Sequence, residues 1–188
     1  MKSTRDHFVS YMQRIEQVSS SLDFDNIEKL RLEISRSLKE QNNLFLCGNG
    51  GSAANANHIA NDLLYGIRPP ETGVRVHSLC SNISVNTCLA NDIGYENIFA
   101  QQLKTLASGG DHLIVLSGSG NSSNIINALI EAKKIGISST ALLGYDGGLC
   151  KDIADNTIHF KIDDMQVCED FQTIIFHMII QNIKEQEG

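Results

Sequence analysis

The sequence predicts an α/β fold, a doubly wound parallel sheet of five strands with helices on both faces, preceded by a pair of N-terminal helices. From Asn43 onward, short apolar runs alternate with helix-like stretches, which is the rhythm of βαβ units. No linker rich in Pro, Gly or Ser divides the 188 residues, and 41% of them are hydrophobic. We therefore expect one domain with a sizeable core over residues 1–188.

The first 40 residues are expected to form the helical pair. Apolar side chains recur at spacings of three and four, and residues 21–25 interrupt the pattern. A helical pair before the first strand usually packs on the side of the domain or on a partner subunit. Residues 1–40 are therefore candidates for forming an oligomer. The two apolar runs are Val9, Met12, Ile15 and Val18, then Ile27, Leu30, Ile34 and Leu38.

Residues 43–188 are expected to form the α/β core. A last helix is predicted over about residues 165–184. Its side chains are apolar almost all round, with His177 in the middle, so we expect burial in the core or in a subunit interface. The five predicted strands cover residues 44–47, 74–79, 112–117, 139–143 and 157–162.

Composition excludes several classes of protein. A formal net charge of −7 argues against a non-specific nucleic-acid binder, although a small phosphorylated ligand could still bind at a helix start. The chain has no basic-then-apolar leader and no apolar run approaching the ~20 residues of a membrane span, so a cytoplasmic protein without a membrane partner is expected. Five cysteines without CxxC spacing, most of them in apolar stretches, predict buried reduced thiols.

The first candidate site is a glycine turn after the first strand, in the run LFLCGNGGS. Glycines let the backbone approach a ligand, and the unpaired N–H groups of the following helix attract anions. Asn49, Gly50, Gly51 and Ser52 are therefore candidate ligands of a phosphate. The same helix carries His58 and Asp62, which share a face and could supply ionisable chemistry or form an ordinary surface pair.

A second turn of this kind follows the third strand. It reads Ser117-Gly118-Ser119-Gly120-Asn121-Ser122, with hydroxyls and free amides suited to an oxyanion, although helix capping uses the same residues. Both turns should lie on one rim, because ligands of parallel sheets bind beyond the carboxyl ends of the strands. Neither turn matches GxxxxGK[ST] or GxGxxG, so a nucleotide site is not indicated.

The last helix adds two more ionisable candidates, Glu169 and His177. About 12 Å of helix rise and an angular offset near 80° separate them. A single ion would be strained to meet both, whereas a pocket lined by both is plausible. A histidine in an apolar helix is more often a core residue than a catalyst, and it would resist charging there without an acid or metal partner.

Taken together, these motifs resemble the sugar isomerase (SIS) domain, and specifically the phosphoheptose isomerases. The resemblance covers essentially the whole chain. It rests on CGNGGS, HIAND at residues 58–62, LSGSGNS, the segment at residues 90–95, GYDGG at residues 144–148 and the histidine of the last helix.

The resemblance implies a tetramer with sites between subunits. It also implies conversion of sedoheptulose 7-phosphate to D-glycero-D-manno-heptose 7-phosphate through an enediol, feeding surface polysaccharide synthesis. Asp62 would be the base and His177 its proton partner. In zinc-bearing members the four metal ligands fall on His58, Asp62, Glu169 and His177. The implied substrate-binding residues are Asn49, Gly50, Gly51, Ser52, Asn91, Asp92, Ser117, Gly118, Ser119, Ser122 and Glu169.

This sequence departs from the family pattern at two of the four metal positions. Asp62 replaces a glutamate and Glu169 replaces a glutamine, although carboxylates remain good zinc ligands. Another phosphosugar is therefore an alternative substrate. Relatives of a different class are non-catalytic tetramers that bind a replication-initiator protein, or sugar-phosphate-sensing domains of regulators. The joint presence of all four ionisable residues favours an enzyme.

Overall fold

The computed structural model describes residues 3–67 and 73–187. Its five strands form one parallel sheet in the order β2-β1-β3-β4-β5, which confirms the predicted fold class. The fifth strand ends three residues earlier than predicted, and the others lie within one residue of their predicted ends. The strands are β1 (Asn43–Gly48), β2 (Arg75–Ser78), β3 (His112–Ser117), β4 (Ser138–Leu143) and β5 (Asn156–His159).

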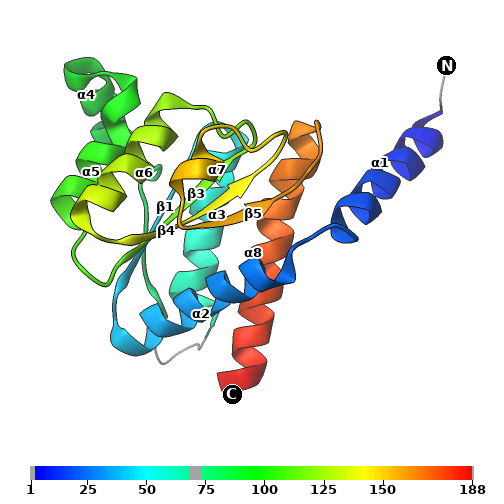
Figure 1. Cartoon of the computed structure of the whole chain (residues 1–188), viewed down its shortest axis with the longest axis horizontal. Helices are drawn as coiled ribbons and strands as arrows, with labels where there is room; N and C mark the ends of the chain where they lie inside the picture. Colours follow the sequence, from blue (N-terminus) through cyan, green and yellow to red (C-terminus); the bar gives the residue numbers. More distant parts are fainter. Residues whose placement is uncertain (1–2, 68–72, 188) are drawn as a thin grey trace.

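Helices cover both faces of this sheet (Figure 1). Side chains of β1 alternate between two cores, with Leu44 and Leu46 packing under α2, α3 and α8, and Phe45 and Cys47 packing under α5 and α6. The helices are α1 (Thr4–Ser19), α2 (Phe24–Glu40), α3 (Gly51–Tyr65), α4 (Ile83–Ile93), α5 (Ile98–Leu106), α6 (Ser123–Ile135), α7 (Cys150–Ile153) and α8 (Met165–Glu187), with a 3₁₀ turn, η1, at Tyr95–Asn97.

The predicted N-terminal pair is present as α1 and α2. Ser3 and Asp6 form a capping box at the start of α1, and Asp23 caps α2. Helix α1 extends away from the body of the molecule in Figure 1, and Val18 is its one buried residue. Phe8 and other apolar side chains of α1 consequently face solvent in the single chain.

Helix α8 is buried on one side only. Phe171 and Phe176 are inaccessible, whereas Ile174, His177 and Met178 are exposed. His177 is therefore not buried in the core of the single chain, because α8 packs against α3 and the sheet and leaves its other side open; its burial in a subunit interface stays a prediction. Within the described residues, no helix has the length and hydropathy needed to cross a membrane.

All five cysteines are free, and four of them are at least partly buried. Burial raises the pKa of Cys47, Cys80 and Cys168, and it raises the pKa of Cys150 to about 11, so these thiols stay protonated at neutral pH. Cys88 is the exception to the predicted burial, because it lies exposed on α4.

The order of the strands creates a switch point between β1 and β3. The chain leaves β1 through α3 toward β2, and it leaves β3 through α6 toward β4, which lies on the other side. Because α3 and α6 cover opposite faces of the sheet, the ends of β1 and β3 diverge there. Such a crevice, outside the carboxyl ends of the strands, is where open parallel sheets bind ligands.

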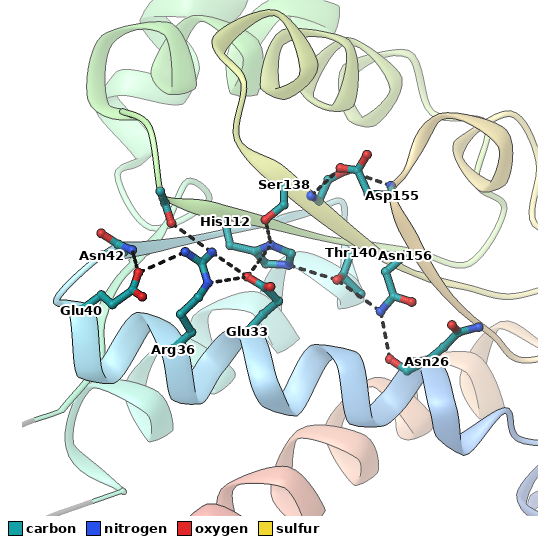
Figure 2. Close-up of polar contacts among 12 residues, drawn as sticks. Asn26, Glu33, Arg36, Glu40, Asn42, His112, Ser138, Thr140, Asp155 and Asn156 are labelled. Carbon is teal, nitrogen blue, oxygen red and sulfur yellow. Dashed lines mark hydrogen bonds and ion pairs between the residues drawn. The ribbon is translucent and has the colours of Figure 1, made fainter.

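A buried polar network lies at the amino ends of β3, β4 and β5, at the opposite end of these strands from the crevice (Figure 2). His112 is 1% exposed; its Nδ1 lies 2.7 Å from Ser138 Oγ and its Nε2 lies 3.0 Å from Thr140 Oγ1. Glu33 Oε2, which pairs with Arg36, lies 3.8 Å from His112 Nδ1. Burial lowers the pKa of His112 to about 4, although Glu33 opposes this shift.

We predict acid-dependent stability from this histidine. Its folded pKa lies below its unfolded value of about 6.5, so the unfolded chain binds more protons between these values. The contribution is full above pH 6.5 and is lost as the pH falls to about 4, with a change of about 3 kcal/mol in unfolding free energy. Urea titrations at pH 7 and 4.5 measure this loss. His112→Gln should reduce the loss of unfolding free energy between the two pH values, and His7→Gln, on α1, should leave it unchanged. An equal loss in the natural protein and both variants would contradict the assignment.

Candidate active site

The first glycine turn joins β1 to α3 with a tight backbone. Gly50, which has a φ of +56°, stands immediately before the helix, in the left-handed region that favours glycine. A Cβ on Gly48 would lie 2.7 Å from the carbonyl carbon of Ser52, so the turn folds back closely on itself. The free N–H groups at the start of α3 therefore open onto the crevice at the switch point.

The second turn orients its hydroxyl groups by hydrogen bonds from its own backbone. The amide of Gly120 donates to Ser117 Oγ at 3.1 Å, and the amide of Asn121 donates to Ser119 Oγ at 3.3 Å. Since these oxygens already accept a bond, the hydroxyl protons remain to be donated to a ligand. This polarity suits an anion with several acceptor oxygens.

The two turns meet in one pocket of about 250 Å³. Helix α8 closes it with Met165 and Glu169. The described lining residues include no lysine or arginine, so an anion would be held by backbone amides, hydroxyls and the start of α3. The predicted residues that line this pocket are Asn49, Gly50, Gly51, Ser52, Ser117, Gly118, Ser119, Ser122 and Glu169.

A pair of asparagine side chains ties the two turns together. Asn49 Nδ2 donates to Asn124 Oδ1 at 2.9 Å, and Asn124 Nδ2 donates to Asn49 Oδ1 at 2.8 Å. Tyr95 donates to the same Asn49 oxygen from the segment after α4. Sequence reasoning missed Asn124, which is 1% exposed; a polar residue among the apolar positions of α6 was the available signal.

Glu169 places a carboxylate in this pocket. It packs directly on Gly51, where any Cβ would collide with its oxygens. In this conformation the side chain of Glu169 therefore occupies the space beside Gly51, and a larger residue there would require Glu169 to turn away. The carboxylate also makes the pocket less favourable for a bare anion, because like charges repel at this range.

Two histidines and an aspartate meet further along α3 and α8. His58 Nε2 lies 2.9 Å from His177 Nε2, so one ring donates and the other accepts. Asp62 Oδ2 lies 3.5 Å from His58 Nε2 and 3.4 Å from His177 Nε2. The side chains of His58 and His177 are half exposed, at 50% and 48%, and that of Asp62 is 27% exposed.

The geometry of this cluster fits a zinc ion. Zinc ligands at 2.0–2.1 Å in a tetrahedron stand about 3.3 Å apart, and two of the three separations are close to this value. Nitrogen and carboxylate oxygen are also the ligand types that zinc accepts. Among the described residues, His58, Asp62 and His177 form the group able to hold a metal, and Glu169 does not join it in this conformation.

A polar seam joins α3 to α8 in the helix turns between the pocket and the histidine cluster. Asn55 of α3 and Gln172 of α8 form it, together with Ser52 and the backbone oxygen of Glu169. Gln172 is fully buried, and sequence reasoning missed it because it was read as part of an apolar helix. We call these four residues the α3–α8 seam.

Two predicted substrate ligands lie elsewhere. Asn91 and Asp92 are exposed on α4, where Asn91 Nδ2 donates to Asp92 Oδ1 at 2.8 Å. Neither residue lines the pocket formed by the two turns. Their role in binding substrate stays a prediction.

Comparison with known proteins agrees with this architecture. The sequence model of the SIS domain matches residues 7–144. The phosphoheptose isomerase of Aliarcobacter butzleri is 34% identical, over 95% of this chain and 94% of its own. The chain belongs to the phosphoheptose isomerase family of SIS-domain proteins.

Other members of the family support the same assignment. The phosphoheptose isomerase of Sulfurimonas denitrificans is 38% identical, over 86% of this chain and 82% of its own. The solved structure of the phosphoheptose isomerase of Neisseria gonorrhoeae superposes with a TM-score of 0.87, at 25% identity and over 95% of each chain. The phosphoheptose isomerase fold therefore includes the N-terminal helices of this chain.

Proposed function

We propose that this protein converts sedoheptulose 7-phosphate to D-glycero-D-manno-heptose 7-phosphate through an enediol, feeding surface polysaccharide synthesis. One observation carries the proposal: α3 has a pocket lined by glycines and hydroxyl groups at its start and a cluster of two imidazoles and a carboxylate further along. Ser52 and His58 are separated by about 9 Å of helix rise, a distance that a phosphorylated chain of several carbons can bridge.

The pocket would hold the phosphate as a fixed handle. Backbone amides at the start of α3 and the hydroxyls of Ser52, Ser117, Ser119 and Ser122 would donate to its oxygens. Such hydrogen bonds to a charged group are shorter and stronger than neutral ones. With the phosphate fixed, the carbonyl end of the sugar extends along α3 toward His58, Asp62 and His177.

Isomerisation then moves one proton from C1 to C2 and another from O1 to O2. Asp62 would remove a proton from C1 of the ketose, the C–H electrons would form the C1–C2 double bond, and His177 would protonate the C2 oxygen. In the second half, a proton returns to C2 and the O1 hydroxyl loses its proton, which gives the aldehyde. Without a metal, the short contact between His177 and His58 would orient the transferring ring nitrogen; a bound ion would take the place of this contact.

We propose that His58, Asp62 and His177 hold zinc, with Glu169 as the fourth ligand implied by the family. The separations of the first three support this, whereas Glu169 would have to turn from the pocket toward them. A bound zinc ion would act as a Lewis acid on the carbonyl oxygen.

We also propose a homo-oligomer, with four subunits as in the family, that covers the half-exposed cluster. The helices that carry the cluster, α3 and α8, also carry exposed apolar side chains, among them Tyr65, at 66% exposure, and Met178. A groove of about 730 Å³ beside α3 has no charged residue among its described lining. The apolar side of α1, which projects from the body, offers a second copy a segment of matching character.

The proposed reaction predicts solvent proton exchange. Incubated with ketose phosphates of five to seven carbons, the protein should exchange a sugar proton with solvent, which NMR detects, and sedoheptulose 7-phosphate should react best. Asp62→Asn and His177→Ala should each lower kcat at least ~100-fold. Asp152→Asn, on α7, is the matched control.

Full activity in either variant would remove the role assigned to that residue. Best turnover of another ketose phosphate would support the alternative substrate. Exchange with none of them would instead favour the non-catalytic scaffold that binds a replication-initiator protein.

Zinc binding is predicted at close to one ion per chain. Metal analysis of the purified protein should find it, and His58→Ala should weaken zinc affinity by more than ~10-fold, since even outer-shell changes have effects of that size. His7→Ala serves as the control. Glu169→Gln tests the fourth ligand, because unchanged affinity would leave Glu169 in the pocket. Zinc content unaltered in both His58→Ala and His177→Ala would refute the site.

Self-association is predicted to depend on α1. Light scattering after size-exclusion chromatography should give a tetramer for the natural chain. Met12→Glu should shift it toward smaller species, because a buried charge opposes association of an apolar face. Gln17→Glu, which lies away from the apolar side of α1, should have little effect. A monomeric natural chain would contradict the proposal.

A further inference from the structure

We propose that Gln172 is a positioning residue that aims the Ser52 hydroxyl at the phosphate of the substrate. The proposal rests on the phosphate-binding role of the pocket. Gln172 lies on α8 with no exposed surface, between the pocket and the histidine cluster. Its described side-chain hydrogen bonds are with Asn55 and Ser52.

The direction of each hydrogen bond in the seam follows from one backbone oxygen. The carbonyl of Glu169 can only accept, so the Asn55 group that faces it at 2.9 Å must be the amide nitrogen. That nitrogen also lies 2.9 Å from Gln172, which must therefore present its oxygen to Asn55. The amide nitrogen of Gln172 then faces the other way, 3.0 Å from Ser52 Oγ.

Ser52 consequently accepts from inside the protein and donates outward. Its oxygen receives the Gln172 N–H, and its described contacts include no acceptor for its own proton. Ser52 is 3% exposed and lines the pocket, so a ligand oxygen is the available partner. A hydroxyl fixed as a donor suits a phosphate, whose oxygens only accept when it is fully ionised.

The same contacts could simply fasten α3 to α8, and the two roles predict different results. A purely structural Gln172 would affect stability and leave ligand affinity unchanged in the folded variant. A positioning Gln172 would act through Ser52, so its loss should matter only while Ser52 is present. Affinity for phosphate and a double-mutant comparison separate these roles.

Gln172→Met removes the amide while keeping a similar volume. We expect the Kd for inorganic phosphate and the KM for the phosphosugar to rise about 10-fold or more, the value of a hydrogen bond to a charged group, while kcat changes less. Ser52→Ala should give a similar rise, and the double variant should bind no worse than Ser52→Ala alone. Gln172→Glu, which presents an acceptor to Ser52, should also weaken binding. Asn156→Leu, which disturbs the polar network at the amino ends of the strands, away from the pocket, should keep the natural KM.

The outcomes distinguish this inference from the proposed function. If Ser52→Ala weakens binding but Gln172→Met binds as the natural protein does, the positioning role is overturned and the phosphate pocket stands. If the natural protein binds neither phosphate nor phosphosugar, both fall. Should Gln172→Met not fold, Asn55→Ala replaces it. A rise of about threefold in the Kd for phosphate and in the KM supports the positioning role, and no change overturns it.

Discussion

Helices α3 and α8 pack side by side and run in the same direction. Successive polar residues of α3 therefore meet successive polar residues of α8. Ser52 and Asn55 bond to Gln172, and His58 meets His177 further along. A shift of one residue, about 1.5 Å along either helix, would break these contacts together. The shape of the pocket and the separation of the histidine cluster from it therefore depend on the same helix pair.

Apolar packing holds that register. The buried face of α8 places Phe171, Ile175 and Phe176 in one core with Ile59 and Leu63 of α3. The polar contacts alone would not fix two helices, because hydrogen bonds exchanged with water contribute only about 1 kcal/mol each. The core positions the helices, and the hydrogen-bonded seam selects one arrangement of them.

Local patterns allowed the sequence to predict the strands and both glycine turns. Hydrophobic periodicity could not show which side of α8 stays uncovered in the single chain, so it could not separate burial of His177 in the core from burial in a subunit interface. Asn124 and Gln172 were missed because their partners lie 75 and 120 residues away in the chain. Helix arithmetic from Glu169 to His177 indicated that one ion would be strained to meet both, and in the structure Glu169 faces the pocket while His177 joins the cluster.

The described lining of the pocket has backbone amides and hydroxyl groups to bind a phosphate, but no lysine or arginine. Glu169 adds a negative charge to it. Bare phosphate would gain the amides and hydroxyls but also meet that repulsion. A phosphosugar gains the same contacts, and its hydroxyls could donate to Glu169 while its carbonyl end reaches the histidine cluster. The binding energy then comes from both the phosphate and the carbonyl end of the sugar. Contacts with the phosphate can in this way lower the barrier to reaction at the carbonyl end. A carboxylate at position 169 thus favours a ligand that carries a polyol chain over the free anion.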